Sequence, residues 1–331
     1  MAPLAIAISG GPRPAEIVDL IRRAEALGYE SAWVAEGHGG DQFAVLAAAA
    51  AGTSKIKLGT AISSVFVRTA PTLAMAAATV QDVSDGRFIL GLGSSHKVQV
   101  EPEHGVAYGK PITRTRETVD FVRRLLDDGQ AAIDGETVRI ENFDLWFQQT
   151  VAPPPIYLAG LFPKMVETSG EIADGLILTR STLATAAEVR KSLAVGAAKA
   201  GKDAAGIAIT SLLPVSVSED RAAAFDRLRP GLAFYMGFFP RYNRLIAEHG
   251  FADEAAKIAE AWARGDRKAA EGFVTDAMLS ATGIVGAPAE CREKIQAYRE
   301  SGIDLPILSP FARGPGAAET FKTVLEALAG A

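Results

Sequence analysis

One pattern of apolar and polar positions recurs along the chain: an amphipathic stretch of helical period, a glycine, and a short aliphatic or β-branched run. In the first instance Pro14 suits the first turn of a helix, where its missing N–H has no helical partner. The apolar positions that follow share one face at 3.6-residue spacing: Ile17, Leu20, Ile21, Ala24 and Leu27. Gly28 supplies a left-handed C-cap, and residues 31–35 are predicted to form a strand.

The same succession predicts further helices at residues 71–83, 163–173 and 288–301. Eight runs are predicted to be strands: residues 4–8, 31–35, 56–62, 88–93, 155–159, 176–179, 207–217 and 305–309. Most are continuously apolar, which is typical of parallel strands buried on both faces. Eight such strands alternating with helices favour an α/β fold of the (β/α)8 (TIM) barrel class over a doubly wound sheet. Since no Ser/Gly-rich linker interrupts the chain, we expect a single domain over residues 1–331.

Two segments exceed the repeat and are predicted to be insertions after strands 4 and 7. Residues 98–154 are expected to hold a loop, a helix from about Thr113 to Leu126 and a hairpin near residues 133–140. Residues 219–280 are helical in pattern throughout. Additions after barrel strands lie on the catalytic face, so both are expected to shape a pocket.

The run that ends in "GLGSSH" raises the question of a dinucleotide fold. That fingerprint needs a third glycine where His96 stands, and the following "KVQVEPEHG" is not expected to begin a helix promptly. As a barrel strand, Gly91 and Gly93 would admit a neighbouring strand or a flat ligand, with Ser94, Ser95 and His96 at the mouth. Relief of crowding inside the barrel explains the two glycines equally well.

Composition excludes several classes of protein. Hydrophobic residues make up 48% and charged residues 22% of the chain, and 34 basic against 39 acidic residues give a net charge of −5 without a basic cluster. Nucleic-acid binding through a basic face is therefore not supported. The longest apolar stretch, residues 43–51, is far short of the ~20 residues of a membrane helix. The first residues lack a basic signal-peptide region, so we expect a cytoplasmic protein without a membrane partner.

The few cysteines and histidines point away from disulfide and metal chemistry. Cys291 is the one cysteine and shares a helical face with Ile295 and Tyr298, which favours packing over nucleophilic chemistry. No H-x-H or H-E-x-x-H spacing occurs among the four histidines, so no metal site is expected. Five aromatic residues in the second insertion are candidates for core or pocket positions: Phe234, Tyr235, Phe238, Phe239 and Tyr242.

Long segments of the chain carry a family likeness. They are "SAWVAE", "IKLGTAISSVFVRTAPTLAMAAATVQDVSDGRFILGLGSS", "PIYLAGLFPKMVETSGEIADGLIL" and "TDAMLSATGIVGAPAE". Together they resemble the bacterial-luciferase-like superfamily. Within it, they are most similar to the branch that uses the deazaflavin coenzyme F420, which includes methylenetetrahydromethanopterin reductase.

The resemblance implies a cofactor site at the mouth of the barrel. It places the flat ring against a bulge in strand 3 with a non-prolyl cis peptide between Ala61 and Ile62; an ordinary trans strand end is the alternative. The resemblance assigns phosphate binding to the loop after strand 5, whose helix would offer unpaired N–H groups; plain capping of that helix is the alternative. The loop comprises Ala159, Gly160, Leu161, Phe162, Pro163, Lys164 and Met165. Further candidates are Ser94, Ser95, Thr179 and Arg180, although Arg180 could instead be a surface residue.

Two residues after strand 2 are the catalytic candidates. Glu36 is expected at the mouth, where it would hold the polar edge of the ring or relay a proton. His38 follows two residues later, and histidine is a side chain suited to accepting and returning protons near neutral pH. Relatives often carry Asp-His or Glu-x-Trp here, so Glu36-Gly37-His38 departs from the family pattern and leaves His38 either in the site or on a solvated loop.

Three functions are compatible with these observations. The first is a coenzyme F420-dependent oxidoreductase that transfers a hydride between deazaflavin C5 and a small organic substrate. The second is an FMN-dependent luciferase-like monooxygenase, and the third is a catalytically silent barrel that binds flavin or deazaflavin. The expected partners are a small-molecule substrate and a second copy of the chain in a homodimer.

Overall fold

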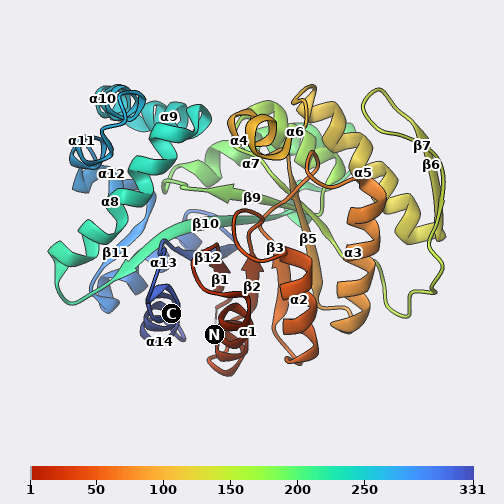
Figure 1. Ribbon diagram of the computed structural model, residues 1–331, viewed down its shortest axis with the longest axis horizontal. Helices are drawn as coiled ribbons and strands as arrows, with labels where there is room; N and C mark the ends of the chain where they lie inside the picture. The colour runs from red at the N-terminus through yellow and green to blue at the C-terminus, as the bar shows by residue number, and fades with distance from the viewer. Residues whose placement is uncertain (1) are drawn as a thin grey trace.

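The chain folds around a closed barrel of eight parallel strands. The computed structural model describes residues 2–331. Parallel pairing runs from strand to strand and closes between the last and the first, as predicted (Figure 1). In barrel order the strands are β1 (Ala5–Ile8), β2 (Ser31–Val34), β3 (Lys57–Thr60), β5 (Phe88–Gly93), β8 (Ile156–Ala159), β9 (Gly175–Thr179), β10 (Ala208–Val217) and β12 (Leu305–Pro310). The (β/α)8 class is therefore confirmed.

Helices cover the outside of the barrel. They are α1 (Pro14–Ala26), α2 (Gln42–Ala51), α3 (Ala70–Val83), α6 (Pro163–Ile172), α7 (Thr185–Lys199), α13 (Pro288–Glu300) and α14 (Ala317–Ala327). A short 3-10 turn, Ala204–Gly206, leads from α7 into β10. In Figure 1 the two termini lie close together, beside α1 and α14, at the end of the barrel opposite α4, α6 and α9. The strands therefore run from the end with the termini towards the end that carries the insertions.

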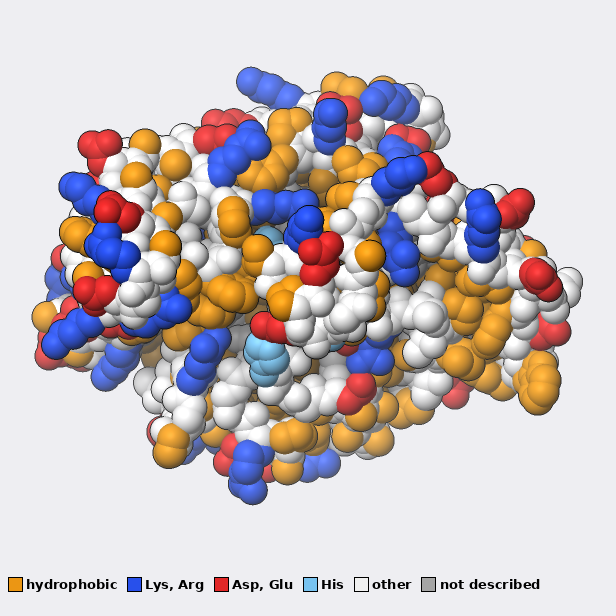
Figure 2. Space-filling view, turned by 45° about the horizontal axis from the view of Figure 1, so that its top comes forward, with side chains coloured by type: hydrophobic (Ala, Val, Ile, Leu, Met, Phe, Trp, Pro, Cys, Tyr) orange, Lys and Arg blue, Asp and Glu red, His pale blue; other side chains and the backbone are white. Residues whose placement is uncertain are grey.

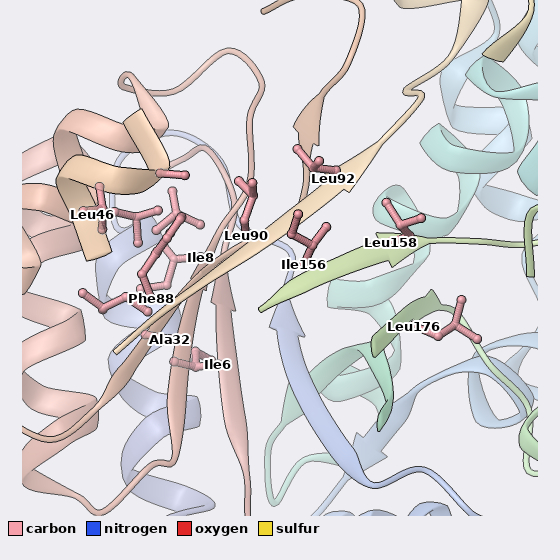
Figure 3. Close-up of a cluster of buried hydrophobic side chains, with 14 of the residues drawn as sticks. Ile6, Ile8, Ala32, Leu46, Phe88, Leu90, Leu92, Ile156, Leu158 and Leu176 are labelled. Atoms are coloured by element: carbon pink, nitrogen blue, oxygen red, sulfur yellow. The ribbon is translucent and has the colours of Figure 1, made fainter. Parts of the chain in front are cut away.

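Two apolar layers stabilise this arrangement. The outer layer fills the space between strands and helices, where the side chains of Ile6, Phe88, Leu90 and Leu158 gather (Figure 3). The inner layer fills the barrel itself with Ala5, Ala7, Trp33, Ile89, Ile177, Leu305 and Ile307. Because apolar strand residues enter both layers, the continuous apolar runs in the sequence match burial on both faces.

Strand 3 is shorter than predicted because a bulge divides it. After β3 the chain resumes as the two-residue strand β4 (Ser63–Ser64), which pairs with β5. Gly59 of β3 pairs with Ile89 of β5, and Ser63 of β4 pairs with Leu92 of β5. The chain therefore advances four positions from β3 to β4 but only three along β5, so one extra residue forms a bulge between β3 and β4. The buried Thr60 hydroxyl bridges the gap, since it accepts from Gly91 N and donates to Gly91 O, both at 2.8 Å.

The first insertion contains two helices and a hairpin. They are α4 (Lys97–His104), α5 (Pro111–Asp128), β6 (Gln130–Asp134) and β7 (Arg139–Asp144). The prediction that no helix begins promptly after His96 was wrong, since α4 begins at the next residue. Burial of Val100 stabilises this short helix despite Pro102 inside it, which shows packing overriding weak local propensity. The missing third glycine remains the valid argument against a dinucleotide fingerprint.

The second insertion is a compact group of helices, which we call the α8–α12 segment. It comprises α8 (Arg221–Phe238), α9 (Pro240–Ile246), a π-helical turn (Ala247–Phe251), α10 (Ala252–Ala263), α11 (Arg267–Gly272) and α12 (Asp276–Thr282). Its buried residues form an apolar cluster of their own, which includes Phe225, Leu232, Met236, Ile258 and Met278. In Figure 1 this segment stands at one side of the barrel and the β6–β7 hairpin at the other.

One further strand, β11 (Ile284–Gly286), was not predicted; it extends the sheet by pairing with the end of β10. No helix within residues 2–331 has the length and apolar character needed to cross a bilayer. On the face shown in Figure 2, basic and acidic side chains are interspersed.

Candidate active site

A large cavity opens at the carboxyl ends of the strands. The cavity has a volume of about 1540 Å³, including the part that is open to solvent. The lining comes from the strand ends, from α4 and from the α8–α12 segment. It includes most of the predicted site residues: Glu36, Ala61, Ile62, Ser94, Ser95, Ala159, Gly160, Leu161, Phe162, Met165, Thr179 and Arg180. Three predicted residues, His38, Pro163 and Lys164, do not line it.

The bulge of strand 3 forms one wall of the cavity. The peptide bond between Ala61 and Ile62 is cis, as the resemblance implied. Gly93 of β5 faces it: a Cβ atom at Gly93 would lie 2.9 Å from Ile62 Cγ1. At Gly91 a Cβ atom would lie 1.9 Å from the carbonyl oxygen of Thr60. Both glycines therefore permit the close approach of a neighbouring strand, and Gly93 leaves room for the Ile62 side chain at the cavity wall.

Glu36 ties strand 2 to the bulge. Its Oε2 accepts hydrogen bonds from Ser64 N at 2.9 Å and from the Ser63 hydroxyl at 3.2 Å, and its Oε1 lies 2.6 Å from Arg68 Nε. Arg68 also pairs with Asp41 at 2.6 Å. Burial alone would lower the pKa of Arg68, but these two carboxylates raise it. Both oxygens of Glu36 thus have partners within the chain, so the residue positions the bulge; proton relay by Glu36 stays a prediction.

The structure does not bring His38 together with Glu36. The His38 side chain is 77% exposed and its Nε2 lies 3.0 Å from Glu103 Oε2 of α4. It therefore stands on the solvated loop outside the cavity, the second of the two positions that the sequence left open.

The loop after β8 offers backbone donors to the cavity. Phe162 is the N-cap of α6, and no side chain caps this helix. The N–H groups of Leu161, Phe162 and Lys164 have no hydrogen-bond acceptor within residues 2–331. At Gly160 a Cβ atom would lie 3.1 Å from Leu176 Cδ1, so a side chain here would crowd strand β9. Free N–H groups and the positive end of a helix are suited to an anion such as a phosphate.

Several lining residues were not predicted as site residues. His96 packs against Phe239 and Tyr242 of the α8–α12 segment, with ring centroids 4.5 and 5.1 Å apart. Burial, with a smaller contribution from the charge of Arg241, lowers the pKa of His96 to about 4. The imidazole is therefore neutral near pH 7 and presents both a donor and an acceptor nitrogen. Its position shortly after β5 was the available signal, but the scattered histidines gave no spacing to support it.

Arg180 lies inside the cavity, so the alternative that it is a surface residue is wrong. The residue is 5% exposed, and its guanidinium carbon lies 4.2 Å from the ring centroid of Tyr235. The backbone at Arg180 has a positive φ of 52°, and its N–H donates to Leu212 O at 3.0 Å. Arg241 of α9 brings a second cation to the lining. Within residues 2–331, no group of three or more His, Cys, Asp or Glu side chains could hold a metal ion.

Comparison with known proteins assigns the family. The family described as luciferase-like monooxygenase matches residues 3–305 of the chain. The chain belongs to this family. The likeness drawn from "SDGRFILGLGSS" and its companion segments is thereby confirmed, and the protein is an oxidoreductase of the luciferase-like family.

Individual relatives span nearly the whole luciferase-like chain. It is 29% identical over 313 residues to the 5,10-methylenetetrahydromethanopterin reductase of Methanolobus tindarius, covering 93% of this chain and 94% of the relative. The solved coenzyme F420-dependent tetrahydromethanopterin reductase of Methanopyrus kandleri superposes with a TM-score of 0.84 at 25% identity, over 99% of this chain and 98% of that one. An F420-dependent secondary alcohol dehydrogenase, solved with an F420-acetone adduct, shares the fold at a TM-score of 0.76 and 21% identity, over 98% and 99% of the two chains.

Proposed function

We propose that this luciferase-like oxidoreductase uses coenzyme F420 and transfers a hydride between the coenzyme and a small organic substrate. The observation that carries the proposal is a single cavity lined both by the Ala61–Ile62 bulge and by Leu161, Phe162 and Met165 of the loop after β8. The solved reductase that is 25% identical to this chain is described as coenzyme F420-dependent, and this likeness favours F420 over FMN.

The residues present suit a flat ring with a phosphorylated arm. Ala61, Ile62, Gly93 and Ala159 give the cavity an apolar wall, and Gly93 keeps it from being filled by a further side chain. The uncapped start of α6 supplies N–H donors at the carboxyl end of the neighbouring strand β8. An apolar surface for the ring and backbone donors for the phosphate are the two features that such a cofactor needs.

When bound, coenzyme F420 supplies a two-electron hydride carrier at ring carbon C5. The chain would position the ring and the substrate. Ile62 would support one face of the ring, and Glu36 would hold the bulge through Ser63, Ser64 and Arg68. Neutral His96 would accept a hydrogen bond from a substrate hydroxyl, or donate one to a carbonyl oxygen, at its ring nitrogens. The aromatic side chains of Tyr235, Phe239 and Tyr242 would exclude water from the other side of the cavity.

Direct binding and turnover test the proposal. Purified protein would be titrated under anaerobic conditions with F420 and separately with FMN, with binding followed by fluorescence. We expect F420 to bind more tightly, and Ile62→Ala to weaken F420 binding about tenfold through lost ring contact, whereas Ile133→Ala in the hairpin would leave it unchanged.

The alternatives give different results. Oxygen uptake with reduced FMN, without F420 binding, would contradict the proposal and favour the monooxygenase. F420 binding with no hydride transfer to or from any of a panel of alcohols, aldehydes and unsaturated carbonyl compounds would favour a silent barrel. The homodimer also stays a prediction. Size-exclusion chromatography with light scattering would test it by measuring the molar mass of the protein in solution.

A further inference from the structure

Arg180 stands out among the charged residues of the chain. Among the buried residues within 2–331, it is the only one that carries a charge. No carboxylate of these residues forms a salt bridge with it, and its guanidinium donates no hydrogen bond within the described chain. By contrast, the partly buried Arg68 pairs with two carboxylates, and Arg87 donates to Ala50, Thr53 and Ile56.

The surroundings of Arg180 compensate its charge only in part. Tyr235 places its ring 4.2 Å from the guanidinium carbon, an arrangement that favours a cation over the ring face. Tyr242 is the other titratable group that acts on Arg180; its pKa is raised, chiefly by burial, so it stays a neutral phenol. A buried cation without an anion is costly, and side chains at left-handed φ carry a further backbone cost. Arg180, which bears both of these energetic costs, lines the cavity.

The remaining charge of the cavity has the same sign. Arg241 lines it from α9, has no salt bridge within residues 2–331 and lies over the Tyr108 ring at 5.7 Å. Glu36 is the acidic lining residue, and Arg68 already pairs with it. His96 adds no positive charge near pH 7. The unpaired charge in the cavity is therefore positive, and an entering anion would meet two guanidinium groups.

We propose that Arg180 binds an oxyanion, a carboxylate or a phosphate, carried by the substrate. This inference rests on the proposed function and names the substrate class for the same cavity. The uncapped start of α6 already provides donors for the phosphate of the cofactor. Arg180 instead lies against Tyr235 of the α8–α12 segment, so its partner is the molecule that enters between that segment and the barrel. Arginine is suited to this role because its planar fork matches both oxyanions.

The experiment uses F420-loaded protein and inorganic phosphate or acetate as the probe. Binding is measured by calorimetry at low ionic strength for the wild type, Arg180→Gln, Arg180→Lys and the control Arg22→Gln. Arg22 is 53% exposed on α1 and pairs with Asp19, so its loss removes a positive charge far from the cavity. We expect at least one of the two anions to bind the wild type and the control alike, about 10- to 100-fold more weakly to Arg180→Gln, and with intermediate strength to Arg180→Lys.

A second measurement separates the two sources of an oxyanion. F420 and its phosphate-free deazaflavin nucleoside are titrated into wild type and Arg180→Gln. We expect the affinity for F420 to change less than about twofold, well below the loss for the probe anion. A large loss for F420 without a loss for the nucleoside would assign Arg180 to the cofactor's phosphate and overturn the proposal. Equal anion binding by wild type and Arg180→Gln, or no binding of either anion by wild type, would also overturn it.

Stability provides an independent check. If Arg180 binds a ligand and does not stabilise the fold, Arg180→Gln unfolds at the same or a higher urea concentration than the wild type. The reason is that the substitution removes an unpaired buried charge. A marked decrease would show that Arg180 serves the fold, and it would contradict the inference. If no F420 binds to any variant, the proposed function fails by itself; the anion titrations, repeated without cofactor, still decide whether Arg180 binds an oxyanion.

Discussion

Replacing Thr60 by valine tests how the bulge beside the cavity is held. The two side chains have nearly the same shape, so the change removes the hydroxyl and adds a methyl group at a fully buried position. Gly91 N would lose its acceptor and Gly91 O its donor, both at 2.8 Å. A buried polar group left without a partner costs about 1–3 kcal/mol, and the added methyl returns about 0.8 kcal/mol. With two such groups, we expect the free energy of unfolding to fall by about 1–5 kcal/mol.

Equilibrium urea unfolding followed by circular dichroism measures this loss. Thr210→Val is the matched control, because Thr210 is also buried in the barrel but makes a single hydrogen bond, to Leu176 O at 3.0 Å. The control is expected to lose about 1 kcal/mol. Affinity for F420 should fall in Thr60→Val alone, since Thr60 directly precedes the Ala61–Ile62 bond. Equal losses for the two variants would refute the idea that one hydroxyl replaces the interrupted strand pairing.

Three further outcomes follow from the structure. Gly93→Ala should weaken F420 binding by displacing Ile62, whereas Gly109→Ala, with open space around it, should not; equal affinities in a fluorescence titration would contradict this. His96 has a folded pKa of about 4 against an ordinary 6.5, so its contribution to stability is present above pH 6.5 and lost as pH falls towards 4. His96→Gln should flatten the pH dependence of urea unfolding in that interval. Cys291 is buried with a pKa raised to about 12, so a thiol reagent should modify it only as fast as the protein unfolds.

The strands of the barrel could be predicted because their signal is local. Each is a short apolar run between a helix and a glycine or turn, and tertiary packing reinforces what the run itself prefers. Strand 3 shows the limit, because its division at Thr60 depends on the register of a neighbouring strand. Helix α4 shows another limit, because its formation depends on the burial of Val100 against the rest of the fold. Sequence patterns carry neither the register nor the packing partner.

The candidate site divides in the same way. The Ala61–Ile62 bond and the residue 159–165 loop were located because long motifs surround them. Arg180 was named without its burial, because the ring that covers it belongs to Tyr235 in another segment. Glu36 was named without its partner Arg68, which lies thirty-two positions further along the chain. Partners that meet only through the fold decide whether a charged residue is paired, exposed or free to bind.

The separate apolar cluster of the α8–α12 segment has a consequence for how such enzymes diverge. Phe225, Met236 and Met278 pack among themselves, while the bulge is supported by Thr60 and Glu36 on the other side of the cavity. The α8–α12 segment can accumulate substitutions, or even be exchanged for that of a relative, without disturbing the hydrogen bonds of Thr60 and Glu36 that hold the bulge. Changes in substrate preference can therefore arise in the α8–α12 segment while the bulge on the other side of the cavity keeps its structure.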